Sequence, residues 1–72
     1  MKYDYPKAIL TLRAKLNISQ DELGKMLGVS FTSINRWENG HYEPTKIVKI
    51  RLQGLFEKND INLEKRSNEN EQ

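Results

Sequence analysis

The stretch SQDELGKMLGVSFTSINRWENG, residues 19–40, decides the fold of this chain. Ser19 and Glu22 have the spacing of a capping box, which marks the start of a helix. Gly28 is a favoured residue just past a helix end, and Ser30 is a favoured cap for a second helix. We therefore predict two short helices joined by a tight turn.

Apolar residues recur at helical spacing in both helices and predict a buried side. They are Leu23, Met26 and Leu27 in the first helix, Val29 in the turn, and Ile34 and Trp37 in the second helix. Gly24 lies inside the first helix, where glycine costs about 1 kcal/mol relative to alanine. Such a glycine indicates that another segment of backbone passes close to it.

Further helices are predicted on both sides of this stretch. The preceding segment, YPKAILTLRAKL, has a proline near its start, where a missing amide hydrogen costs nothing, and apolar residues at helical spacing. Residues 46–58 repeat apolar side chains at the same spacing, and no segment shows the alternation of a strand. The chain is therefore predicted to be all-α, a compact bundle of four to five short helices.

The length and charge indicate one small domain with a polar end. A chain of 72 residues has room for a single domain, which we place at residues 1–58. That segment has ten Lys and Arg against six Asp and Glu, whereas residues 59–72 have two against four. We expect residues 59–72 to be a flexible tail, in which Ile61 and Leu63 form either a small dimer contact or a cover for the last helix. A mildly basic domain is compatible with a polyanionic partner.

The composition disfavours several classes of function. The chain has no cysteine and one histidine, so no disulfide, metal site or catalytic triad is predicted. It also lacks a glycine-rich phosphate loop, and we expect neither enzyme activity nor a cofactor. No apolar run is long enough to cross a membrane, and we expect a cytoplasmic protein.

The second helix of the central stretch has side chains on its outward side that suit a DNA groove. At about 100° per residue, the side opposite Ile34 contains Thr32, Asn35 and Arg36, and Phe31 is exposed beside them in the first turn. Arg bonds the guanine edge through two donors, Asn pairs with adenine, and Thr or an aromatic ring contacts the thymine methyl group. The alternatives are a solvated helix face, a ring of Phe31 folded against its own helix, and a phosphate contact for Arg36.

These residues resemble the helix-turn-helix of the Cro and lambda-repressor-like family, also called the xenobiotic-response-element regulators. The matching elements are Ser19-Gln20, Leu23, Gly24, Gly28-Val29, Ile34 and the WENG ending of residues 37–40. Arg13 matches an arginine in the first helix of the family. The resemblance covers residues 6–58 and implies a lambda-repressor-like bundle whose second and third helices bind DNA. The family commonly has two short helices after the loop, where residues 46–58 indicate one longer helix.

The resemblance also implies roles for individual residues. Base contacts are expected from Phe31, Thr32, Ser33 and Arg36, beside Asn35 on the same outward side. Phosphate contacts are expected from Ser19, Gln20 and Asn39. Arg13 and Glu38 are expected to form a partly buried ion pair that ties the first helix to the end of the third. Lys46 and Lys49, near the start of the last helix, are either further phosphate contacts or surface residues.

The sequence therefore predicts sequence-specific binding of double-stranded DNA, by a bacterial or phage transcriptional repressor without a small-molecule ligand. One such domain offers a small interface, so we expect a homodimer on a two-fold symmetric operator. The alternative is a protein-interaction module, such as an antitoxin or an adaptor, built on the same bundle.

Overall fold

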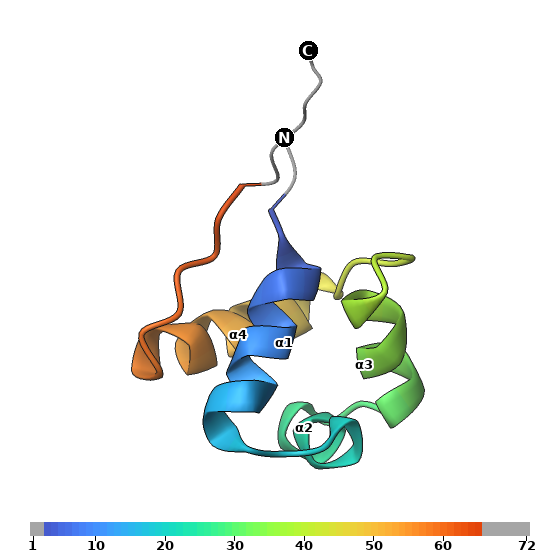
Figure 1. Cartoon of the computed structure of the whole chain (residues 1–72). Coiled ribbons are helices and arrows are strands. Elements are labelled where there is room, and N and C mark those ends of the chain that lie inside the picture. Colours follow the sequence, from blue (N-terminus) through green and yellow to red (C-terminus); the bar gives the residue numbers. More distant parts are fainter. Residues whose placement is uncertain (1–2, 66–72) are drawn as a thin grey trace.

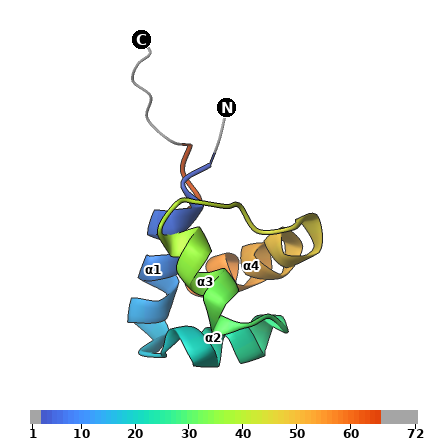
Figure 2. The ribbon, with the colours of Figure 1, turned by 90° about the vertical axis from the view of Figure 1, so that its right-hand side faces the viewer.

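Four helices make up the domain in a computed structural model, which describes residues 3–65. They are α1 (Tyr5–Leu16), α2 (Gln20–Leu27), α3 (Phe31–Glu38) and α4 (Lys46–Lys58). Figures 1 and 2 show α2 lying below α1, α3 and α4 in both views. The predicted all-α bundle is confirmed, and residues 46–58 form the single longer helix that their spacing indicates.

The apolar sides of the four helices meet in one core. The buried apolar residues are Tyr5, Ala8, Ile9, Leu12, Leu23, Leu27, Ile34, Trp37, Val48, Leu52, Phe56 and Ile61. The prediction for Met26 is wrong, because this side chain is 51 % exposed. Leu23 and Leu27 already define the buried side of this short helix, and Met26 points about 60° away from Leu23 and about 100° away from Leu27.

All four helices between residues 3 and 65 end in the same backbone motif. A left-handed residue follows each helix: Asn17, Gly28, Gly40 and Asp60. The next amide then donates back to a carbonyl near the helix end: Ile18 to Arg13, Val29 to Gly24, His41 to Arg36, and Ile61 to Phe56, at 2.8 to 3.1 Å. This pattern satisfies carbonyls that the helix leaves unpaired. Ile18, Val29 and Ile61 then pack on the core, whereas His41 is exposed.

The core extends past residue 58, where the sequence placed the domain boundary. Ile61 is only 8 % exposed, and Leu63 packs against the core. The amide of Asp4 donates to the carbonyl of Glu64 at 2.7 Å, so residues 61–65 run beside the start of α1 (Figure 1). Ile61 therefore covers the end of α4, which was one of the two alternatives for it. The expected tail beyond residue 65 lies outside the described residues.

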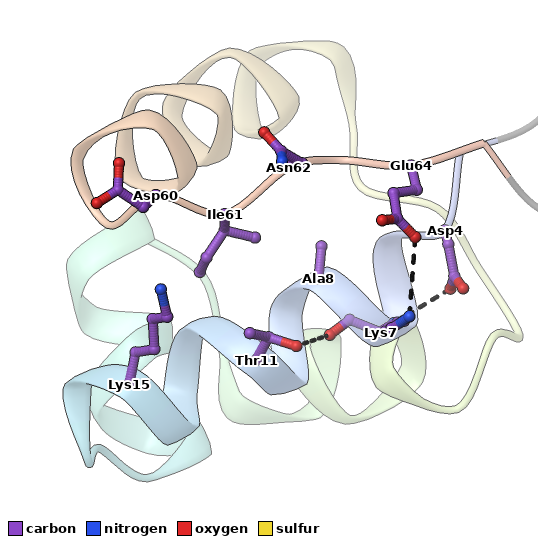
Figure 3. A pocket seen from close by; sticks show the side chains of 9 residues that line it. All are labelled: Asp4, Lys7, Ala8, Thr11, Lys15, Asp60, Ile61, Asn62 and Glu64. Atoms are coloured by element: carbon purple, nitrogen blue, oxygen red, sulfur yellow. Dashed lines mark hydrogen bonds and ion pairs between the residues drawn. The ribbon is translucent and has the colours of Figure 1, made fainter.

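A cavity of about 200 Å³ lies between α1 and this C-terminal segment (Figure 3). Ala8 and Thr11 line it from one side, and Ile61 and Asn62 line it from the other. Two lysines at its rim are bonded to the protein: Lys7 pairs with Glu64 at 3.7 Å, and the Lys15 amine donates to the Asn59 carbonyl at 2.8 Å. The cavity is therefore the space left where the C-terminal segment packs against α1.

Gly24 lies where α2 approaches the turn that leads into α3. A Cβ atom built at this position is 2.6 Å from the carbonyl oxygen of Val29. Atoms do not approach so closely without a shift, and here the neighbour is backbone rather than a flexible side chain. The close approach expected from the sequence is therefore present, and it sets the distance between the two helices.

Gly24→Ala and Gly54→Ala are a matched pair that tests this close approach. Gly54 is also inside a helix, but a Cβ there meets no atom within 4 Å. We expect Gly54→Ala to raise the free energy of unfolding by up to about 1 kcal/mol, through helix propensity alone. We expect Gly24→Ala to be about 1–3 kcal/mol less stable than Gly54→Ala, because the turn must move. Chemical denaturation measures both, and equal stability of the two variants contradicts the close approach.

Candidate nucleic-acid interface

The two sides of α3 differ completely in exposure. Ile34 is fully buried and Trp37 is 6 % exposed, so these residues fix the rotation of the helix on the core. The outward side consists of four exposed residues: Phe31, Thr32, Asn35 and Arg36. The ring of Phe31 is 55 % exposed rather than folded away against its helix. The division predicted from the helical spacing is therefore present.

Thr32 and Arg36 have polar groups that are available to a ligand. Among residues 3–65, neither side chain takes part in a hydrogen bond or an ion pair with another side chain or with the backbone. Together with the half-exposed ring of Phe31, they form a small outward face with no acidic residue. We call Phe31, Thr32 and Arg36 the outward triplet.

Three other predicted contact residues are already bonded within the protein. The Ser33 hydroxyl lies 3.4 Å from that of Ser30, whose oxygen caps the start of α3. The Asn39 amide group donates to the Asn35 carbonyl at 2.8 Å and to the Asn35 side-chain oxygen at 3.0 Å. Any contact that Asn39 makes through this nitrogen must replace one of these bonds. The side chains of Ser33, Asn35 and Asn39 are thus used within the protein to stabilise the two ends of α3.

The carboxylate of Glu38 joins three helices at the end of α3. Arg13 of α1 donates to it through Nε at 2.6 Å and through Nη2 at 3.0 Å. Gln20 of α2 donates to the same carboxylate through Nε2 at 2.9 Å. The hydrogen bond with Glu38 raises the pKa of Arg13 above its ordinary value, and this arginine stays charged. The Arg13–Glu38 pair expected from the resemblance is therefore present, with Gln20 as a further partner.

The start of α2 offers backbone amides next to this network. Ser19 caps the helix and Glu22 completes the capping box, as the sequence predicts. The amides of Gln20 and Asp21 occupy the first helical positions, which have no partner inside a helix. Such amides at the positive end of a helix dipole are suited to an anion. Three carboxylates lie near these amides: Glu22 accepts from the Ser19 amide, Glu38 accepts from the Gln20 side chain, and Asp21 is 3.5 Å from the amine of Lys25.

The two lysines at the start of α4 have different surroundings. Lys49 donates to Glu43 at 2.9 Å and lies 5.3 Å from the centre of the Tyr5 ring. The hydrogen bond with Glu43 raises the pKa of Lys49, and burial partly opposes that shift. For Tyr5, a neutral phenol, burial has the opposite effect and raises the pKa. Lys46 is exposed and belongs to no ion pair among the described residues. Of these two lysines, Lys46 is therefore the one that is available to an external anion.

Tyr42 is a neighbour of the outward triplet that the sequence did not reveal. The guanidinium carbon of Arg36 lies 5.3 Å from the centre of the Tyr42 ring, which is within the range of a cation–π contact. Tyr42 lies in the loop between α3 and α4 and is 61 % exposed. Helical spacing says nothing about the path of a loop, so only an arginine and an aromatic residue close in sequence hinted at this contact.

Two further findings concern residues 3–65 as a whole. They contain no group of three or more His, Cys, Asp or Glu side chains that could hold a metal ion. No helix in the same range is long and apolar enough to cross a membrane.

The chain belongs to the helix-turn-helix family of the Cro and C1 type, whose members are DNA-binding regulatory domains. The family model, described as Helix-turn-helix, matches residues 9–54, which is more than half of the 72 residues. Neither a search of curated proteins nor a search of solved structures found a match. The matched range includes α2, α3 and the turn between them.

Glu38→Ala tests whether the carboxylate at the end of α3 holds the three helices together. The substitution leaves Arg13 partly buried without its partner and frees Gln20. We expect the free energy of unfolding to fall by about 2–4 kcal/mol, which thermal or chemical denaturation measures.

Glu57→Ala is the matched control for this measurement. Glu57 accepts one hydrogen bond from Gln53 on the exposed side of α4, and its loss is expected to cost about 0.5 kcal/mol or less. Equal losses in the two variants contradict the role assigned to Glu38.

Proposed function

We propose that this protein is a sequence-specific transcriptional repressor that inserts α3 into the major groove of double-stranded DNA. One observation supports it most: the outward triplet is exposed and without acidic residues, on a helix whose opposite side is locked in the core. Membership of a DNA-binding family supports the class of ligand. In this proposal Arg36 bonds a guanine edge, and Thr32 and Phe31 contact base edges or a thymine methyl group.

The phosphate anchors in this proposal lie on both sides of α3. The amides at the start of α2, with Ser19 and the second amide hydrogen of Gln20, bind one phosphate. Lys46 binds the DNA backbone on the other side. Asn39 binds phosphate when one of its hydrogen bonds to Asn35 is replaced by a bond to the DNA. These contacts fix the position of α3 on the duplex without selecting a sequence.

In this proposal the protein represses transcription by occupying the promoter DNA, because blocking a promoter needs no enzyme activity or cofactor. A bacterial or phage origin and a cytoplasmic location belong to the same proposal. The competing function, an antitoxin or adaptor, requires a protein ligand on the exposed apolar side chains and no preference among DNA sequences.

The test begins with selection from a random duplex library, followed by gel-shift titration of the selected duplex and of random DNA at two salt concentrations. We expect a recovered consensus and an affinity that falls steeply with salt, since phosphate contacts release counterions. Recovery of no consensus, with equal binding of selected and random DNA, overturns the proposed function and favours the protein-interaction alternative.

Arg36→Ala and Lys46→Ala separate base contacts from phosphate contacts. We expect Arg36→Ala to cost about 1–3 kcal/mol on the selected duplex and to relax the preference for one base pair. Lys46→Ala is expected to weaken selected and random DNA alike and to lower the salt slope by about one. The same titrations measure both variants, and an unchanged sequence preference in Arg36→Ala contradicts the base contact.

We also propose that two copies bind a two-fold symmetric operator with half-sites about one helical turn apart. The outward side of α4 supports a self-contact, because Ile47 and Ile50 are 64 % and 68 % exposed. Their spacing places both side chains on neighbouring positions of the helix.

Sedimentation at micromolar concentration tests the dimer, with and without the selected duplex. We expect at least a weak dimer that the Ile47→Ser/Ile50→Ser double variant dissociates. A protein that stays monomeric in both conditions contradicts the two-fold arrangement while leaving the base contacts of one domain intact.

A further inference from the structure

We infer that Tyr42 positions Arg36 for base recognition, and is thus a residue that determines sequence preference without touching a base. This inference rests on the proposed function of the α3 face. The observation behind it is the contact between the Arg36 guanidinium and the Tyr42 ring, at 5.3 Å from the ring centre. Tyr42 lies outside α3 and is not part of the outward triplet, so the helical spacing of α3 does not predict this contact.

Arg36 lacks the other means by which a protein fixes an arginine. The nearest carboxylate in sequence, Glu38, is bonded to Arg13 and Gln20. No ion pair within residues 3–65 involves Arg36, and its side chain is exposed. A long side chain of this kind occupies many rotamers and loses them when it bonds a base edge. The Tyr42 ring is therefore the group that restricts the guanidinium before DNA binds.

The loop on both sides of Tyr42 is held by contacts of its neighbours. On one side, the amide of His41 donates to the carbonyl of Arg36 at 3.1 Å, so the loop starts from a bond to the same residue that the ring contacts. On the other side, Pro44 is buried, and Glu43 accepts from Lys49 at 2.9 Å. These contacts hold the backbone of Tyr42 close to the end of α3, within reach of the Arg36 side chain.

The chemistry of the contact suits a guanine contact. Guanidinium groups stack on aromatic faces, and this leaves the edge of the fork, with its paired donors, free for the O6 and N7 atoms of guanine. An ion pair with a carboxylate would instead use the same donors. Tyr42 thus holds the arginine without competing for the bonds that select a base.

The experiment compares Tyr42→Leu, which removes the ring, with Tyr42→Phe, which keeps the ring and removes the hydroxyl. The duplex is the one that the wild-type protein selects from a random library. We expect Tyr42→Leu to weaken its binding about two- to fivefold, the range of an exposed cation–π contact. Binding to random duplex stays the same, the melting temperature stays the same, and Tyr42→Phe restores the wild-type affinity.

A double-mutant cycle with Arg36→Ala distinguishes positioning from a direct contact. We expect Tyr42→Leu to have no effect on affinity in the Arg36→Ala background. A repeated selection with Tyr42→Leu is expected to show a weaker guanine preference at the position that Arg36→Ala relaxes, and no change elsewhere in the consensus.

Three results overturn the inference while leaving the proposed function intact. Equal weakening in Tyr42→Phe assigns the effect to a hydroxyl contact with phosphate. Equal loss on selected and random duplex assigns it to the loop backbone, and a loss that persists in the Arg36→Ala background shows that Arg36 is not involved. Failure of the wild-type protein to select any consensus overturns the proposed function, and this inference with it.

Discussion

The carboxylate of Glu38 is the constraint on which the arrangement of the first three helices depends. It binds Arg13 of α1 through two hydrogen bonds and Gln20 of α2 through a third. The remaining terminal nitrogen of Arg13 donates to the Ile18 carbonyl at 3.1 Å, where α1 ends. A single charged group at the end of α3 therefore holds the C-terminal part of α1 and the first residue of α2 next to each other. Because both partners are largely withdrawn from water, neither tolerates the loss of the other.

The same network continues to the surface and links stability to recognition. The side-chain nitrogen of Asn35 lies 3.5 Å from the Gln20 side-chain oxygen, and the side-chain oxygen of Asn35 accepts from Asn39 at 3.0 Å. The first of these is a weak contact by length alone, yet it continues a chain of amides from the carboxylate to the outward side of α3. One set of bonds thus links Glu38 to Gln20, Asn35 and Asn39 at the surface. The outward triplet lies just beyond this set and keeps its own donors free.

Local chemistry explains which features the sequence could predict. The capping box of Ser19, the cap at Ser30 and the helix end at Gly28 depend on neighbours within five residues, and all are present. The exposed and buried sides of α3 follow from the 3.6-residue period in the same way. The Arg13–Glu38 pair spans distant positions, and only resemblance to a family indicated it.

Features that depend on tertiary path were missed for a physical reason. Met26 has the spacing of a core residue, but α2 is short and two leucines already fill its buried side. Ile61 lies in a polar segment whose composition indicates a tail, and its burial depends on a left-handed turn at Asp60 that no glycine announces. Tyr42 lies in a loop, where periodicity gives no direction. Ile61 and Tyr42 lie where the chain continues after a helix has ended, whereas Met26 lies inside α2, of which the core covers only one side.

The closure of residues 61–65 on the start of α1 has a consequence for synthesis on the ribosome. The helices emerge in order, but Ile61, which shares a cavity with Ala8, emerges near the end of the described chain. A nascent chain that ends directly after α4 already contains the turn between α2 and α3. It still exposes part of the surface that Ile61 and Leu63 cover in the whole domain. The first and last segments of the domain thus complete the core together, so folding is expected to finish in one late, cooperative step rather than helix by helix.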